Sequence, residues 1–205
     1  MPTSLLPMQL LSVNVAQPEP LQVEGGRTVM SAIRKRPVSV LGQPARIAVG
    51  PMGIEGDGQA DPTVHGGLSK AVYAYPHEHY EFWQTVRAQA QAQGWGDALA
   101  HGGMGENLTL TGLYEADVYV GDLLRFPDCV LAVSEPRQPC YKFQAVMGFK
   151  QAAKMMVQSG YCGFYLSVRQ NGTLAAGEAY ELVPGPREVS IRELFQAKMS
   201  GRRDM

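Results

Sequence analysis

The sequence predicts a mainly β fold with a few helices, and three observations predict it. The 205 residues include 23 Gly and 14 Pro, which favour frequent turns over long helices. Several short apolar segments alternate every second residue, as half-buried strands do. Apolar residues make up 45% of the chain and charged residues 18%, a composition that can bury a core. At this length we expect one domain over residues 1–205.

The expected strands of the N-terminal half are short and are separated by turn-forming residues. Leu11, Val13 and Val15 recur every second residue in the first of them, residues 9–15. Three further strands are expected here: residues 28–33, 37–41 and 45–49. Residues 50–67 are rich in Gly, Pro and Asp and lack periodicity, so we expect a long loop there, of the kind that often carries function.

The second half combines strands with two or three helices. Residues 70–75 alternate like a strand, and Pro76 then opens an expected helix over 76–93. The remaining expected elements are strands at 108–110, 118–126, 130–134, 164–168 and 179–183 and a helix at 149–159. Ser190 and Glu193 form a capping-box pattern, so residues 190–205 are expected to be a short C-terminal helix or a frayed tail.

Charge and cysteine usage exclude several classes of function. A formal net charge of −1 gives no overall field to hold a polyanion, which argues against binding a nucleic-acid polymer. Three cysteines make an odd count without regular spacing, which fits a reducing compartment. No apolar run approaches the ~18 residues of a membrane span, and no secretory leader is evident. We therefore expect a cytoplasmic protein that does not bind membranes.

Cys140 is the strongest candidate for chemistry, because Arg137 and Lys142 flank it. Nearby cations favour the thiolate, the form that attacks electrophiles and binds metals. Two alternatives stay open: Cys140 is a small buried apolar residue, or the P-R-Q-P segment before it is a simple polyproline II turn. Cys129 and Cys162 have no cation within three residues and are expected to fill the core.

Several loops could bind an anion, although each has a structural alternative. His65 with Gly66 and Gly67, followed by Lys70, offers donors and close backbone approach, or simply a tight turn. The segment GGMGENL at 102–108 lacks the order of a nucleotide P-loop, so Glu106 and Asn107 hold either a polar ligand or the loop itself. The basic run at 34–36 is either solvated or a phosphate contact.

Seven motifs taken in order resemble the MOSC domain, the molybdenum cofactor sulfurase C-terminal domain family. They are SAIRK (31–35), GIEGD (53–57), HGG (65–67), KAVYAYP (70–76), GENL (105–108), GD (121–122) and PRQPCYK (136–142). The resemblance covers a core of about residues 13–183. It is closest to the bacterial stand-alone branch that reduces N-hydroxylated purines such as 6-N-hydroxylaminopurine.

This resemblance implies a MOSC-type β-barrel, similar to the pyruvate kinase β-barrel, that binds the molybdenum cofactor, molybdopterin. It makes Cys140 the catalytic residue and the protein ligand of molybdenum. The cofactor-binding residues that it implies are Lys35, His65, Lys70, Asn107, Ser134 and Arg137. The family is also associated with pyridoxal phosphate binding.

The implied activity is a detoxifying molybdenum-dependent oxidoreductase that reduces N-hydroxylated bases or related N-oxygenated compounds to amines. Its partners would be the small-molecule substrate and a separate electron-donor redox protein, and a homodimer is left open. Two alternatives remain: a sulfur-transfer domain with a Cys140 persulfide, and a non-catalytic cofactor-binding module. The sequence departs from the family pattern at Tyr161 and Cys162, where relatives commonly have a basic residue. Longer relatives also continue into a C-terminal three-helix module beyond the helix that Ser190 is expected to begin.

Overall fold

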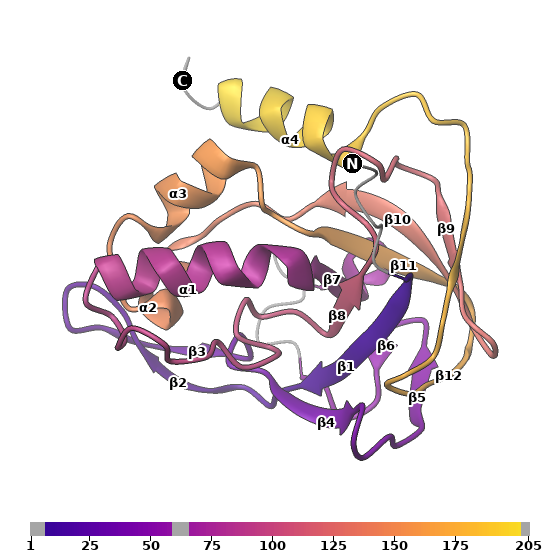
Figure 1. The fold of residues 1–205 in the computed structure, drawn as a ribbon, viewed down its shortest axis with the longest axis horizontal. Coiled ribbons are helices and arrows are strands. Elements are labelled where there is room, and N and C mark those ends of the chain that lie inside the picture. The colour runs from indigo at the N-terminus through magenta and orange to yellow at the C-terminus, as the bar shows by residue number, and fades with distance from the viewer. Residues whose placement is uncertain (1–6, 59–65, 202–205) are drawn as a thin grey trace.

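The computed structural model describes residues 7–58 and 66–201, and most of its regular structure is strand (Figure 1). The strands are β1 (Gln9–Val15), β2 (Glu19–Gln22), β3 (Thr28–Ser31), β4 (Arg36–Val40), β5 (Ile47–Gly50), β6 (Gly53–Ile54), β7 (Val72–Pro76), β8 (Leu108–Thr111), β9 (Leu123–Arg125), β10 (Val130–Pro136), β11 (Phe164–Gln170), β12 (Gly172–Leu174) and β13 (Glu181–Val183). The helices are α1 (Tyr80–Gln89), α2 (Tyr141–Met147), α3 (Ala152–Ser159) and α4 (Ile191–Ser200), with short 3-10 turns η1 (Leu68–Lys70) and η2 (His77–His79).

Eight strands form the main sheet, in the order β13-β9-β10-β11-β7-β8-β1-β4. Every neighbouring pair is antiparallel except β7 and β8, which are parallel. The sheet curls, since the segment that leads into edge strand β13 also bonds to β1. The Leu10 amide donates to the Glu178 carbonyl at 2.9 Å, and the Tyr180 amide donates to the Met8 carbonyl at 3.2 Å. The fold is therefore a barrel-like, mainly β structure, as the sequence predicted.

Two smaller sheets and the helices complete the fold. Strands β12, β5 and β6 form a three-stranded sheet, and β2 and β3 form a hairpin. Figure 1 shows α1, α2 and α3 gathered on one side, while α4 lies apart from them and packs against β10. Trp83 of α1 meets Phe143 of α2 edge to face, with ring centroids 5.4 Å apart, and both side chains are fully buried.

The boundaries of several elements differ from expectation. The helix expected over 76–93 starts as the turn η2, and α1 ends at Gln89 because Gln91 adopts a left-handed backbone with φ 58°. The strand expected over 118–126 is only β9, because the Asp122 carboxylate accepts a hydrogen bond from the Tyr119 amide at 3.0 Å and bends the chain. Lys70 ends η1 instead of starting a strand.

Helix α2 was not expected from the sequence. It spans seven residues immediately after Cys140 and ends where Gly148 turns left-handed with φ 81°. Within the described part of the chain, no helix is long and apolar enough to span a lipid bilayer.

Candidate functional site

Five of the seven predicted site residues line a single cavity, although they come from four separate segments of the chain. These residues are Lys35, Lys70, Asn107, Arg137 and Cys140. Ser134 is not among the lining residues, and His65 lies outside the described residues. The curled sheet thus brings together groups that the sequence singled out one by one, at the end of β10 and around the start of β7.

Cys140 is the residue before the first turn of α2 and is half-buried in the cavity wall. The other two thiols are core residues, as expected. Burial raises the pKa of Cys129 to about 12 and raises the pKa of Cys162 well above its ordinary value. Both therefore stay protonated at neutral pH, and neither lines the cavity. Among the three cysteines, the cavity presents only the Cys140 thiol to a ligand.

Arg137 is a buried cation with unused hydrogen-bonding capacity. Its side chain is sandwiched by aromatic rings, with the guanidinium carbon 4.7 Å from the Phe143 ring centroid and 5.1 Å from that of Tyr73. The residue is only 5% exposed, and its Nη1 has no hydrogen-bond partner among the described residues. Because a buried charged donor without an acceptor is costly, this nitrogen indicates an anionic or carbonyl-bearing ligand in the cavity.

Lys35 has a charge partner already. Its Nζ lies 2.5 Å from Oδ1 and 2.7 Å from Oδ2 of Asp57. Burial lowers the pKa of Lys35, and the ion pair with Asp57 opposes that shift. Lys35 and Asp57 together bring little net charge to the cavity, so Lys35 is a weaker anion contact than its position in the sequence suggests.

The Asn107 side chain stabilises the part of the cavity wall that holds Lys35 and Asp57. Its Oδ1 accepts a hydrogen bond from the Tyr73 amide at 3.0 Å, and its Nδ2 donates to the Asn14 carbonyl at 3.2 Å and to Asp57 at 2.8 Å. These contacts join β1, β7 and the Asp57 loop to the residue before β8. The predicted cofactor contact at Asn107 remains a prediction, since its side-chain amide is engaged within the protein.

Two glycines of the GGMGENL segment place Lys35 in the cavity wall. A β-carbon on Gly102 would lie 2.7 Å from the Lys35 carbonyl oxygen, and one on Gly105 would lie 2.9 Å from the Ile33 side chain. Both glycines also have φ of +84°, a conformation that other residues rarely adopt. The segment therefore packs against residues 33–35, and Gly105 itself lines the cavity.

Two further polar residues are Ser134, which contacts the turn that contains Lys70, and Lys142, which lines the cavity. The Ser134 hydroxyl donates to the Ser69 carbonyl at 2.5 Å, so it holds the turn η1 in place, and the predicted cofactor contact at Ser134 remains a prediction. Lys142 lines the cavity, and its Nζ donates to the Met30 carbonyl at 3.3 Å. The sequence indicated Lys142 only as a cation near Cys140 and not as a site residue. Its position in the first turn of α2 makes it a cavity cation, and that helix was not foreseen.

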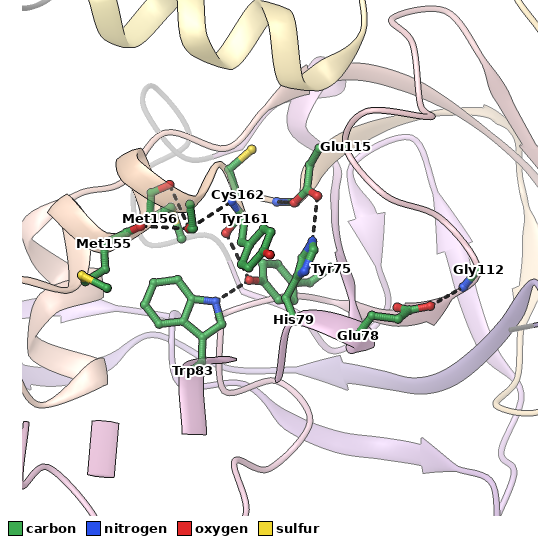
Figure 2. Close-up of polar contacts among 12 residues, drawn as sticks. Tyr75, Glu78, His79, Trp83, Gly112, Glu115, Met155, Met156, Tyr161 and Cys162 are labelled. Carbon is green, nitrogen blue, oxygen red and sulfur yellow. Dashed lines mark hydrogen bonds and ion pairs between the residues drawn. The ribbon is translucent and has the colours of Figure 1, made fainter. Parts of the chain in front are cut away.

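A network behind the cavity fixes the loop before β11. The hydroxyls of Tyr73 and Tyr75 donate to the carbonyls of Cys162 and Tyr161 at 2.8 and 3.1 Å. Figure 2 shows His79 bonded to Glu115 at 2.8 Å, with Tyr161 beside the His79 ring. The two rings are stacked, with centroids 3.7 Å apart. The two positions at which the sequence departs from its relatives therefore lie outside the cavity lining.

The fold and the cavity define a class of protein: a curled β domain that presents one thiol among cationic and aromatic side chains. The sequence pattern of the MOSC domain matches residues 61–181. The chain belongs to the MOSC domain family. The family is associated in general with the molybdenum cofactor.

Individual relatives agree with this assignment. The chain is 36% identical over 184 residues to YflK from Bacillus subtilis, an alignment that covers 89% of this chain and 77% of YflK. It is 36% identical over 143 residues to YiiM from Escherichia coli, covering 69% of this chain but 61% of YiiM. Among solved structures, YiiM from Geobacillus stearothermophilus has a TM-score of 0.73 and 32% identity, covering 96% of this chain and 86% of that one.

A longer relative has a functional name. A protein from Gibberella moniliformis named as a reductase is 30% identical over 193 residues, which cover 90% of this chain and 33% of that protein. The chain therefore corresponds to about one third of a larger protein in this case.

Proposed function

We propose that this protein binds the molybdenum cofactor in the cavity around Cys140 and reduces N-hydroxylated bases or related N-oxygenated compounds to amines. The observation that carries the proposal is the pairing of the half-buried Cys140 thiol with the buried, unpartnered Nη1 of Arg137 in one cavity. A thiol suits a soft or high-valent metal, and a guanidinium suits a phosphate. The cofactor carries both groups.

The donor set of the cavity fits a metal that brings most of its own ligands. Within residues 7–58 and 66–201, no three His, Cys, Asp or Glu side chains converge on one point that could hold a metal ion. A structural zinc or iron site needs three or four protein ligands. Molybdenum held by the dithiolene sulfurs of a pterin needs only one further protein ligand, which Cys140 would supply.

When bound, the cofactor would supply two-electron oxygen-atom chemistry, so that an N-hydroxylated compound, two electrons and two protons give the amine and water. Cys140 would hold the metal as thiolate. Arg137, Lys70 and Lys142 would bind the anionic end of the cofactor, and each charge-assisted hydrogen bond adds about 1.5–3 kcal/mol. The rings of Tyr73 and Tyr165, which also line the cavity, would exclude water from that end.

The electrons would come from a separate redox protein, because the sequence shows no flavin or iron–sulfur motif. The reductase name of the Gibberella relative supports a reductive activity. The physiological substrate is proposed as a class, N-hydroxylated compounds, of which 6-N-hydroxylaminopurine is the first to assay.

The test is a molybdenum measurement on protein made in a host that synthesises the cofactor. We expect stoichiometric molybdenum in the wild type, its loss in Cys140→Ala, and its retention in the matched control Cys129→Ala, with the melting temperature of each variant recorded. With a chemical reductant, the wild type should convert 6-N-hydroxylaminopurine to adenine. A folded wild type without molybdenum would defeat the proposal.

Two other outcomes identify the alternatives. A mass increase of about 32 Da on Cys140 without molybdenum would indicate a persulfide and a sulfur-transfer domain. Bound cofactor without turnover of any N-hydroxylated compound would indicate a non-catalytic binding module.

A further inference from the structure

We propose that Glu135 is a positioning residue for Lys70, and that Lys198 of the C-terminal helix α4 controls how strongly Glu135 holds it. This inference rests on the anion-binding role proposed above for Lys70. It makes α4, which does not line the cavity, a determinant of anion affinity there.

The geometry is a carboxylate shared between two ammonium groups. Glu135 lies in β10, and its Oε2 is 2.8 Å from Nζ of Lys198 while its Oε1 is 3.7 Å from Nζ of Lys70. The Glu135 and Lys70 side chains are 22% and 27% exposed, so solvent screens their interaction only in part. The contact of α4 with β10 places Lys198 on Glu135.

Lys70 contacts Glu135 and also lines the cavity. Its Nζ lies 5.8 Å from the centroid of the Tyr165 ring, and both residues line the cavity. Ser134 holds the Ser69 carbonyl, so the backbone next to Lys70 is anchored and only its side chain can shift. Lys70 can therefore turn toward Glu135 or toward an anion in the cavity.

One carboxylate cannot neutralise two ammonium groups. Lys198 makes the short contact, and Lys70 makes the long one, which leaves most of the Lys70 charge available to a ligand. Without Lys198, Glu135 would bind Lys70 closely, and the Lys70 ammonium group would then be less available to a ligand in the cavity. Without the Glu135 charge, Lys70 would be released toward the cavity.

The test uses the purified full chain without cofactor and inorganic phosphate as the probe, with binding measured by calorimetry. We expect Lys198→Met to weaken phosphate binding about threefold and Glu135→Gln to strengthen it about threefold, the scale of a partly exposed ion pair. In the double variant, affinity should equal that of Glu135→Gln alone, because Lys198 acts only through Glu135.

The double variant distinguishes an effect of Lys198 that acts through Glu135 from a general loss of positive charge. A general loss of charge would lower phosphate affinity whether or not Glu135 is present. Arg192→Met is the matched control, since Arg192 is an exposed cation on the same helix, and it should leave phosphate affinity unchanged.

A second measurement, the acetylation rate of Lys70, needs no ligand. Limited acetylation followed by mass spectrometry should modify Lys70 more slowly in Lys198→Met and faster in Glu135→Gln, because an ammonium group held closely against a carboxylate is less accessible to the reagent.

Equal acetylation of Lys70 in all variants would overturn the inference, as would a Lys198→Met effect that persists unchanged in the Glu135→Gln background. If the wild type binds no measurable phosphate, the acetylation rates decide. Absence of molybdenum from the protein would defeat the proposed function without touching this result, because neither readout uses the cofactor.

Discussion

Lys35 and Asp57 form a buried ion pair in which Nζ lies 2.5 Å from Oδ1 and each side chain is 8% exposed. Asp57 also accepts hydrogen bonds from the Ala16 amide at 2.9 Å and from Asn107 at 2.8 Å. The pair therefore connects the loop after β6 to the residue after β1 and to the residue before β8. Its main contribution is to hold the cavity wall in shape.

Removing one partner of this pair should cost more than removing both. Asp57→Asn leaves a buried ammonium without its counter-charge, so we expect the free energy of unfolding to fall by about 3 kcal/mol. Adding Lys35→Met should recover part of that loss. Urea denaturation gives the free energy of unfolding of each variant. The control is Glu181→Gln, in the exposed ion pair with Arg125. This control should change stability by less than about 1 kcal/mol.

Arg137→Lys should weaken anion binding although it keeps the charge. The planar guanidinium fits between the Tyr73 and Phe143 rings, whereas an ammonium cannot stack there or donate in a fork. We expect phosphate affinity to fall about tenfold, the value of one charge-assisted hydrogen bond. Arg169→Lys, at an exposed position on β11, should have no effect, and an unchanged affinity in Arg137→Lys would show that Nη1 does not contact the ligand.

Glu106→Gln should destabilise the fold. The fully buried carboxylate accepts hydrogen bonds from the Gly102 and Met104 amides at 2.8 and 3.0 Å and from the Thr109 hydroxyl at 2.9 Å, as well as from the Tyr80 hydroxyl. An amide nitrogen in place of one oxygen would face donors, so we expect a loss of about 1–3 kcal/mol in urea denaturation. The matched change at the exposed Glu81 of α1 should be neutral.

Stability should fall in mild acid because of two neighbouring histidines. The rings of His77 and His101 meet at right angles with centroids 5.2 Å apart. Burial lowers the pKa of both, and His77 lowers that of His101 further. The folded state therefore binds fewer protons than the unfolded state below the ordinary value of 6.5, and stability is lost as the pH falls through that value.

The variant His101→Asn should reduce this pH dependence, because one of the two depressed groups is gone. Urea midpoints measured at about pH 7.5 and about pH 5 give the comparison. An equal drop in the variant and the wild type would assign the acid sensitivity to other groups.

Local patterns were sufficient for much of the fold. The alternation at residues 9–15 predicted β1, and the Ser190 and Glu193 pattern predicted the start of α4, where both hydrogen bonds of the capping box are present. The cations around Cys140 were also visible, since they are close in the chain. These signals involve residues within a few positions of each other, so no distant contact is needed to interpret them.

The element boundaries and the partners of the charged groups required the tertiary structure. Helix α2 is too short for its periodicity to show, and its end depends on the backbone of Gly148. Nothing local indicates that Asp57 neutralises Lys35 or that the Ser134 hydroxyl donates to a carbonyl of the turn η1. Each of these contacts joins segments that are far apart in the chain.

The sequence by itself determined that this protein is a mainly β member of the MOSC family with a thiol set among cations, because strand alternation and clustered motifs are written along the chain. Only the tertiary structure decided which of the predicted cationic residues are paired with a carboxylate, and how closely. That depends on burial and on carboxylates brought from other segments of the chain, as Asp57 is to Lys35 and Glu135 is to Lys70. Burial and pairing arise only when the sheet curls and its segments meet.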